Sequence, residues 1–192
     1  MGAPVELILY AEPGGELGAR CAEFWAAMSA ADAATDAQTY PPHVTLTGFF
    51  HRDPSRMMPI LDAFTRAVDA AAPRGLDGVR WVAAAALELQ VNHDWAGFHV
   101  AAPWMDAVVA AFAAPDSAAQ PADAEDELRP KSWLHLSLAY GTGFDEFART
   151  ATAEHTVELQ GLIAEDEWTV SLWRRDGSAW DRLTSVDVGA AS

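Results

Sequence analysis

The pattern of hydrophobic and polar positions along the first half of the chain predicts strands that alternate with helices. In chain order it gives a buried strand at residues 5–13, a helix within 14–34, a second strand at 41–50 and a helix from 54 to about 72. Asp53 and Pro54 are suited to the N-cap and the first turn of the second helix, because Asp accepts hydrogen bonds from free backbone N–H groups and Pro has none to offer.

The second half of the chain continues the same alternation. In chain order it gives one or two strands within 79–92, a helix from about 103, a strand at 131–141, a helix at 143–156 and a hairpin over 167–188. The hairpin is expected to turn at Asp176 and Gly177, and the tail 189–192 is expected to be loose. Together the elements predict an α+β fold with central antiparallel or mixed sheets flanked by helices, rather than a doubly wound parallel fold. A chain of 192 residues is expected to form one domain with two lobes.

One segment between these elements has no apolar period. Residues 114–130 are rich in Pro, Ala and acidic side chains, and this composition predicts a long loop. Loops of this length have two interpretations, either a linker or disordered insertion, or a lid over a site. The sequence leaves both open.

The second predicted strand, PPHVTLTGFF, carries polar residues at alternate positions. Successive side chains of a strand point to opposite faces, so His43, Thr45 and Thr47 share one face while Val44 and Leu46 share the other. An antiparallel strand with one solvated face gives the same pattern. Taken alone, the segment therefore does not establish a functional site.

The same order of residue types returns in WLHLSLAYG. His135 and Ser137 share a face with Trp133, and the leucines between them face the other way. Of the six histidines, only His43 and His135 are followed two residues later by a hydroxyl side chain. If the two strands lie side by side, they form a symmetric pocket with two imidazoles and two hydroxyls.

These four groups suit phosphoryl transfer. In-line displacement at phosphorus needs a base at the attacking oxygen, an acid at the leaving oxygen and hydrogen-bond donors for the oxygens between them. Histidine fits both proton-transfer roles, because its unperturbed pKa of about 6.5 allows one ring to be neutral and the other protonated. Neither motif contains a carboxylate or thiol at ligand spacing, so we expect no catalytic metal and no cofactor.

The segments LYAEP, PPHVTL and HLSLAY make the chain similar to the 2H phosphoesterase superfamily, which is named for its two H-x-[S/T] motifs. The likeness is greatest to plant- and yeast-type cyclic phosphodiesterases and is weak between residues 75 and 130. It implies a two-lobed fold with pseudo-twofold symmetry and a metal-independent opening of a cyclic phosphodiester. It also implies that His43 and His135 are the acid and the base, in an order that stays open, and that Thr45 and Ser137 hold the phosphoryl oxygens.

Two tyrosines extend the resemblance as candidates for substrate binding: Tyr10 in the first strand, and Tyr140 five residues after the second histidine. Trp133 is a further candidate for stacking on a substrate, because it lies on the face of the second motif. Packing in the core is the alternative for each. Strict alternation places Tyr140 on the face opposite the histidine, so its role requires the strand to bend or end near Gly141. Further basic candidates for holding the substrate are Arg129, Lys131, Arg174 and Arg175.

Charge narrows the class of partner. The formal net charge is −16, from 28 acidic and 12 basic residues, and Lys131 is the only lysine. Such a surface repels polyanions, so we expect a small cyclic phosphate as the substrate and no long nucleic acid. The single cysteine, Cys21, excludes a disulfide within the chain, and neither a secretion signal nor a spanning segment is recognisable. We therefore expect a cytoplasmic monomer with no membrane partner.

The leading hypothesis is a hydrolase that opens a 2',3'-cyclic nucleotide, or a phosphate of the ADP-ribose 1'',2''-cyclic type, to a phosphomonoester. Whether a 2'- or a 3'-phosphate results stays open. One alternative is an enzyme acting on 2',3'-cyclic phosphate ends of RNA, although basic runs are missing. Another is a nucleotide-binding or regulatory module without turnover, or an interaction domain that uses the acidic loop.

Overall fold

The computed structural model describes residues 3–75, 78–122, 125–159 and 167–190. Within these ranges the strands are β1 Val5–Pro13, β2 Val44–Thr45, β3 Phe50–Arg52, β4 Trp81–Val82, β5 Ala86–Val91, β6 Trp95–Ala101, β7 His135–Tyr140, β8 Trp168–Asp176 and β9 Ala179–Ala190. The helices are α1 Gly15–Ala30, α2 Met57–Ala71, α3 Pro103–Phe112 and α4 Glu146–His155, with 3-10 turns η1 Asp36–Thr39, η2 Pro54–Arg56 and η3 Thr156–Leu159.

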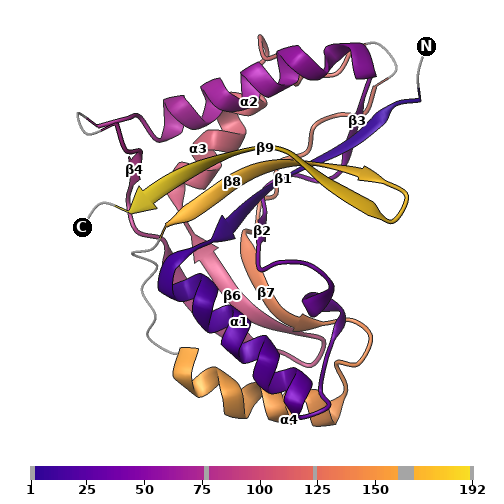
Figure 1. Ribbon diagram of the computed structural model, residues 1–192, viewed down its shortest axis with the longest axis vertical. Coiled ribbons are helices and arrows are strands. Elements are labelled where there is room, and N and C mark those ends of the chain that lie inside the picture. Colours follow the sequence, from indigo (N-terminus) through magenta and orange to yellow (C-terminus); the bar gives the residue numbers. More distant parts are fainter. Residues whose placement is uncertain (1–2, 76–77, 123–124, 160–166, 191–192) are drawn as a thin grey trace.

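The strands form one sheet in the order β4-β9-β8-β1-β2-β7-β6-β5, with β3 also paired to β1. Among the described strands only β4 and β9 run parallel to each other, so the sheet is mixed and the expected α+β class is confirmed. Figure 1 shows α2 and α3 together beside β8 and β9, and α1 and α4 together near β6 and β7. Strand β1 lies in the middle of the sheet although it comes first along the chain.

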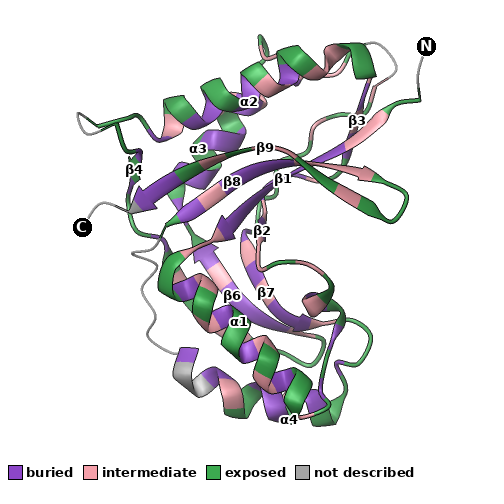
Figure 2. Ribbon diagram, in the orientation of Figure 1, coloured by how far each residue is buried: buried purple, intermediate pink, exposed green. Residues whose placement is uncertain are grey.

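The helices form where the apolar spacing predicts them. In α1 the buried side chains are Leu17, Cys21, Phe24 and Met28, which lie on one stripe of the helix, and Figure 2 shows such buried stripes on the helices. Burial raises the pKa of Cys21 to about 12, so this thiol is a small buried residue. The side chain of Asp53 accepts a hydrogen bond from the backbone N–H of Ser55, and the helical segment ends at Ala71, one residue before the predicted limit.

The prediction of a continuous strand over 41–50 is wrong. Within this range only β2 and the first residue of β3 are strand. Between them, the N–H of Leu46 donates to the carbonyl oxygen of Leu9 in β1, and the N–H of Gly48 donates to the carbonyl oxygen of Arg129 in loop 114–130. Thr47 forms an isolated bridge with Pro130. Thr47 is fully buried, and its hydroxyl accepts a hydrogen bond of 3.1 Å from the backbone N–H of Leu9. Its polar side chain therefore holds β1.

The C-terminal hairpin is confirmed with small differences. Asp176 pairs with Ala179, so the two turn residues are Gly177 and Ser178, one position later than predicted, and Gly177 has a φ of 60°. The expectation of a loose tail is wrong for residues 189–190, which belong to β9 and pair with β4; residues 191–192 lie outside the described residues. No helix within the described ranges is long and apolar enough to span a membrane.

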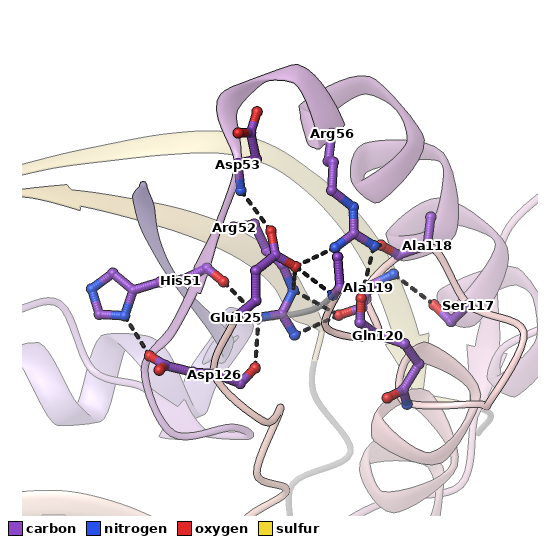
Figure 3. A network of polar contacts seen from close by, with 11 residues as sticks. His51, Arg52, Asp53, Arg56, Ser117, Ala118, Ala119, Gln120, Glu125 and Asp126 are labelled. Atoms are coloured by element: carbon purple, nitrogen blue, oxygen red, sulfur yellow. Dashed lines mark hydrogen bonds and ion pairs between the residues drawn. The ribbon is translucent and has the colours of Figure 1, made fainter. Parts of the chain in front are cut away.

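The described part of loop 114–130 has no helix or strand and is held against β3 and η2 (Figure 3). The fully buried Arg52 donates hydrogen bonds to the carbonyl oxygens of Ala119 and Asp126. Arg56 donates to backbone oxygens of the same loop and forms an ion pair with Glu125. These contacts fix the loop on the body of the protein.

Candidate active site

The two motif strands are neighbours. Strands β2 and β7 run antiparallel, and Val44 pairs with Leu136. By this register, His43 lies across from Ser137 and Thr45 lies across from His135, all on the same face of the sheet. The four side chains line one cavity of about 330 Å³. The structure therefore brings together the groups that the two sequence motifs predict.

Both histidines are oriented by the same local contact. His43 Nδ1 lies 2.8 Å from the carbonyl oxygen of Pro41, and His135 Nδ1 lies 3.3 Å from the carbonyl oxygen of Trp133. A carbonyl oxygen only accepts, so Nδ1 carries the proton in each ring. The Nε2 atom is then left to accept a proton when the ring is neutral, or to donate one when the ring is charged.

Burial lowers the pKa of both histidines, because water that would stabilise the charged ring is excluded. For His43, the Pro41 carbonyl and Glu12 oppose this lowering, while His135 adds to it. For His135, the Trp133 carbonyl opposes it, while Lys131 and His99 add to it. Both rings therefore favour the neutral state more than a histidine in water does.

Ser137 has a partner that sequence reasoning missed. The indole Nε1 of Trp95, in β6, donates a 2.9 Å hydrogen bond to Ser137 Oγ. With an acceptor position of the oxygen occupied, the hydroxyl proton of Ser137 is free to donate into the cavity. The contact depends on Gly97, since a Cβ there would lie 2.6 Å from Trp95 Cζ2 and 2.2 Å from the Leu136 carbonyl oxygen. Nothing in the local sequence marks Trp95, because its role follows from the pairing of β6 with β7.

A β-bulge places Tyr140 beside the motif residues. The pairing of β6 with β7 shifts between Ala96 and Gly97, so that β7 has one extra residue there. Gly97 pairs with Ser137 and Trp95 pairs with Tyr140, which returns Tyr140 to the face of Ser137. Tyr140 lines the same cavity. The required departure from alternation is thus present: the bulge lies at Leu138, and β7 ends at Tyr140, directly before Gly141.

The other two aromatic candidates pack against the histidines: Trp133 is stacked on His135, and Tyr10 is tilted by 36° against His43. The ring of Tyr10 is 4.0 Å from that of His43, measured between centroids, and Tyr10 is 7% exposed. The ring of Trp133 is 4.3 Å from that of His135 at an angle of 24°, and Trp133 is 45% exposed. Tyr10 is therefore packed in the core as well as against the histidine, whereas Trp133 is too exposed to be a core residue. Each histidine has one face covered by an aromatic ring.

A second cavity of about 290 Å³ adjoins the first and shares His43, Thr45 and Tyr140 with it. Its further lining residues include four aromatic residues and two cations: Tyr10, Tyr40, Phe49, Trp180, Lys131 and Arg175. Of the four basic candidates, Arg129 and Arg174 line neither cavity. The described residues of loop 114–130 line neither cavity as well.

Comparison with known proteins gives no family for the chain. A scan against models of protein families finds no match, and a search of curated proteins finds none. Among the described residues, no group of three or more His, Cys, Asp or Glu side chains is arranged to hold a metal ion. The geometry around His43 and His135 is therefore the basis for assigning a function.

Proposed function

We propose that the protein is a hydrolase of the 2H phosphoesterase type, which opens a cyclic phosphodiester to a phosphomonoester without a metal ion. The observation that carries this proposal is the antiparallel pairing of β2 with β7, together with the single cavity lined by His43, Thr45, His135 and Ser137. Two imidazoles and two hydroxyls on one face are the groups that in-line displacement at phosphorus needs.

We also propose that residues 1–192 form a single domain with two lobes, which are related by pseudo-twofold symmetry. An antiparallel strand pair has a local twofold axis perpendicular to the sheet. Beyond β2 lie β1 and β8, and beyond β7 lie β6 and β5. The pair α2 and α3 would belong to one lobe, and the pair α1 and α4 to the other.

The chemistry follows from the two rings. One neutral histidine takes a proton from water through Nε2 while the water oxygen forms a bond to phosphorus. The other, protonated histidine donates its Nε2 proton to the sugar oxygen as the bond between that oxygen and phosphorus breaks. Thr45 and Ser137 donate hydrogen bonds to the remaining phosphoryl oxygens, where negative charge increases in the transition state. One water is consumed, and the arrangement fits either histidine in either role.

The substrate class is a small cyclic phosphate, of the nucleoside 2',3'-cyclic or ADP-ribose 1'',2''-cyclic type. The net charge of −16 disfavours binding of long nucleic acid. A screen of the four 2',3'-cyclic mononucleotides and a short oligonucleotide with a 2',3'-cyclic end, with 2'- and 3'-phosphate products resolved, tests this. We expect turnover of mononucleotides that survives EDTA. Faster turnover of the oligonucleotide would favour the RNA-end alternative, and binding without opening at any pH would overturn the enzyme proposal in favour of a regulatory module.

The pH profile of kcat/KM is expected to be a bell whose maximum lies on the acid side of pH 6.5. The base histidine must be neutral and the acid histidine protonated, and burial lowers both pKa values from 6.5. Activity is therefore lost as pH falls through the pKa of the base and as pH rises through the pKa of the acid. Bound phosphate favours the charged rings, so the maximum of kcat should lie at higher pH than that of kcat/KM. A kcat/KM maximum on the alkaline side of pH 6.5 would contradict this assignment.

A further inference from the structure

The two cavities around the motif residues differ in charge. Both are lined by His43, Thr45 and Tyr140, but the lining of the first also includes the acidic residue Asp94. The lining of the second includes the basic residues Lys131 and Arg175 and no acidic residue. In a protein with 28 acidic and 12 basic residues, this difference makes one side of an otherwise symmetric site more positive than the other. An anionic part of a ligand is favoured on the side of Lys131.

Lys131 is held in place by the backbone. Its N–H donates a 3.0 Å hydrogen bond to the carbonyl oxygen of Leu46, and the N–H of Gly48 donates a 2.8 Å bond to the carbonyl oxygen of Arg129. The start of the segment leading to β7 is thereby attached along the continuation of β2, beside Thr45. No carboxylate of the described residues forms an ion pair with Lys131, although acidic residues far outnumber basic ones. The only lysine of the chain is thus available to a ligand.

Arg175 is fixed from two sides. Its guanidinium forms an ion pair with Glu6, including a hydrogen bond of 2.9 Å from Nη2 to Oε1. It also lies 4.2 Å from the ring centre of Phe49, a cation–π contact. Arg175 therefore adds a partly neutralised positive charge to the cavity wall, and Lys131 supplies the unpaired one.

We propose that the second cavity is a subsite for another phosphoryl group of the substrate, bound by Lys131 while the cyclic phosphate lies between the two histidines. The inference rests on the proposed function and narrows its substrate class to nucleotides that carry a second phosphoryl group, such as a nucleoside 2',3'-cyclic phosphate with a 5'-phosphate. The two cavities share three lining residues and therefore adjoin each other, as a ligand that occupies both requires.

The test compares adenosine 2',3'-cyclic phosphate with the same compound carrying a 5'-phosphate. We expect wild-type kcat/KM to be roughly 10- to 100-fold higher for the 5'-phosphorylated substrate, mainly through KM, because a hydrogen bond to a charged group contributes on that scale. Lys131→Met should bring the ratio of the two kcat/KM values close to one. Arg129→Met removes the same charge two positions away and outside both cavities, so it should keep the wild-type ratio.

The outcomes separate the two proposals. Opening of both substrates at equal kcat/KM by the wild-type protein, or loss of the preference in both variants alike, overturns the second subsite and leaves the proposed function intact. If neither substrate is opened, the proposed function fails, and calorimetric binding of adenosine 3',5'-bisphosphate and adenosine 3'-phosphate tests the subsite on its own. Tighter binding of the bisphosphate that disappears in Lys131→Met supports the subsite, and equal affinities overturn it.

Discussion

His43→Ala and His135→Ala are each expected to lower kcat/KM for opening of a cyclic phosphate by roughly 10²- to 10⁴-fold, the usual contribution of a positioned acid or base. Each substitution removes one of the two proton carriers that line the cavity. Thr45→Ala and Ser137→Ala should cost less, because each removes one neutral hydrogen-bond donor. Steady-state rates on a 2',3'-cyclic mononucleotide, with folding checked by circular dichroism, provide the measurement.

His155→Gln is the matched control for this series. His155 is the last residue of α4 and lines neither of the two cavities around the motif residues. The kcat/KM of the His155→Gln variant should therefore equal that of the wild-type protein. A loss of less than about 10-fold in either motif histidine variant would be too small for a general acid or base and would contradict the proposed roles.

Arg52→Leu is expected to lower the free energy of unfolding by about 3–5 kcal/mol, as when one partner of a buried charged network is removed. Arg52 is fully buried, and its guanidinium donates to Ala119 O at 2.6 and 2.9 Å and to Asp126 O at 2.8 Å. The substitution leaves these carbonyl oxygens without their donor, and Glu125 loses a cation 3.7 Å away. Denaturation by urea measures the change directly.

An exposed arginine provides the comparison for Arg52. Arg174 pairs with Asp181 on the C-terminal hairpin, where the two side chains are 44% and 52% exposed. Solvent screens such a pair, so Arg174→Leu should lower the free energy of unfolding far less than Arg52→Leu does. Equal losses in the two variants would show that the network in Figure 3 does not hold the loop as strongly as its burial indicates.

The sequence predicts those parts of the fold that local patterns determine. Strand β1, the helices and the C-terminal hairpin each have their own apolar period or turn residues, and their bounds are close to the prediction. Strand β6 was not predicted, because its Ala and Gly residues lead into a helix without a break in pattern. Its strand conformation comes from pairing with β5, just before it in the chain, and with β7, which is remote in sequence.

In the site, too, some features follow from local sequence patterns and others from the pairing of strands. The sequence predicts four residues of the site, because the same H-x-[S/T] pattern occurs twice along the chain. These residues are His43, Thr45, His135 and Ser137. The position of Tyr140 depends on a bulge, and a bulge is a property of two strands together. The contact of Trp95 with Ser137 depends on the space above Gly97. Such features arise from the register between segments, which no single segment determines.

The central place of β1 has a consequence for how the chain folds. One edge of β1 pairs with β8 along its length, from Glu6 with Arg175 to Pro13 with Trp168. Because β8 comes much later in the chain, β1 is synthesised well before the strand with which it pairs. Contacts between such distant segments slow folding, since a long loop must close before they form. Until then an apolar strand edge is open to pairing with other chains, and this period is when the nascent protein is most prone to aggregate.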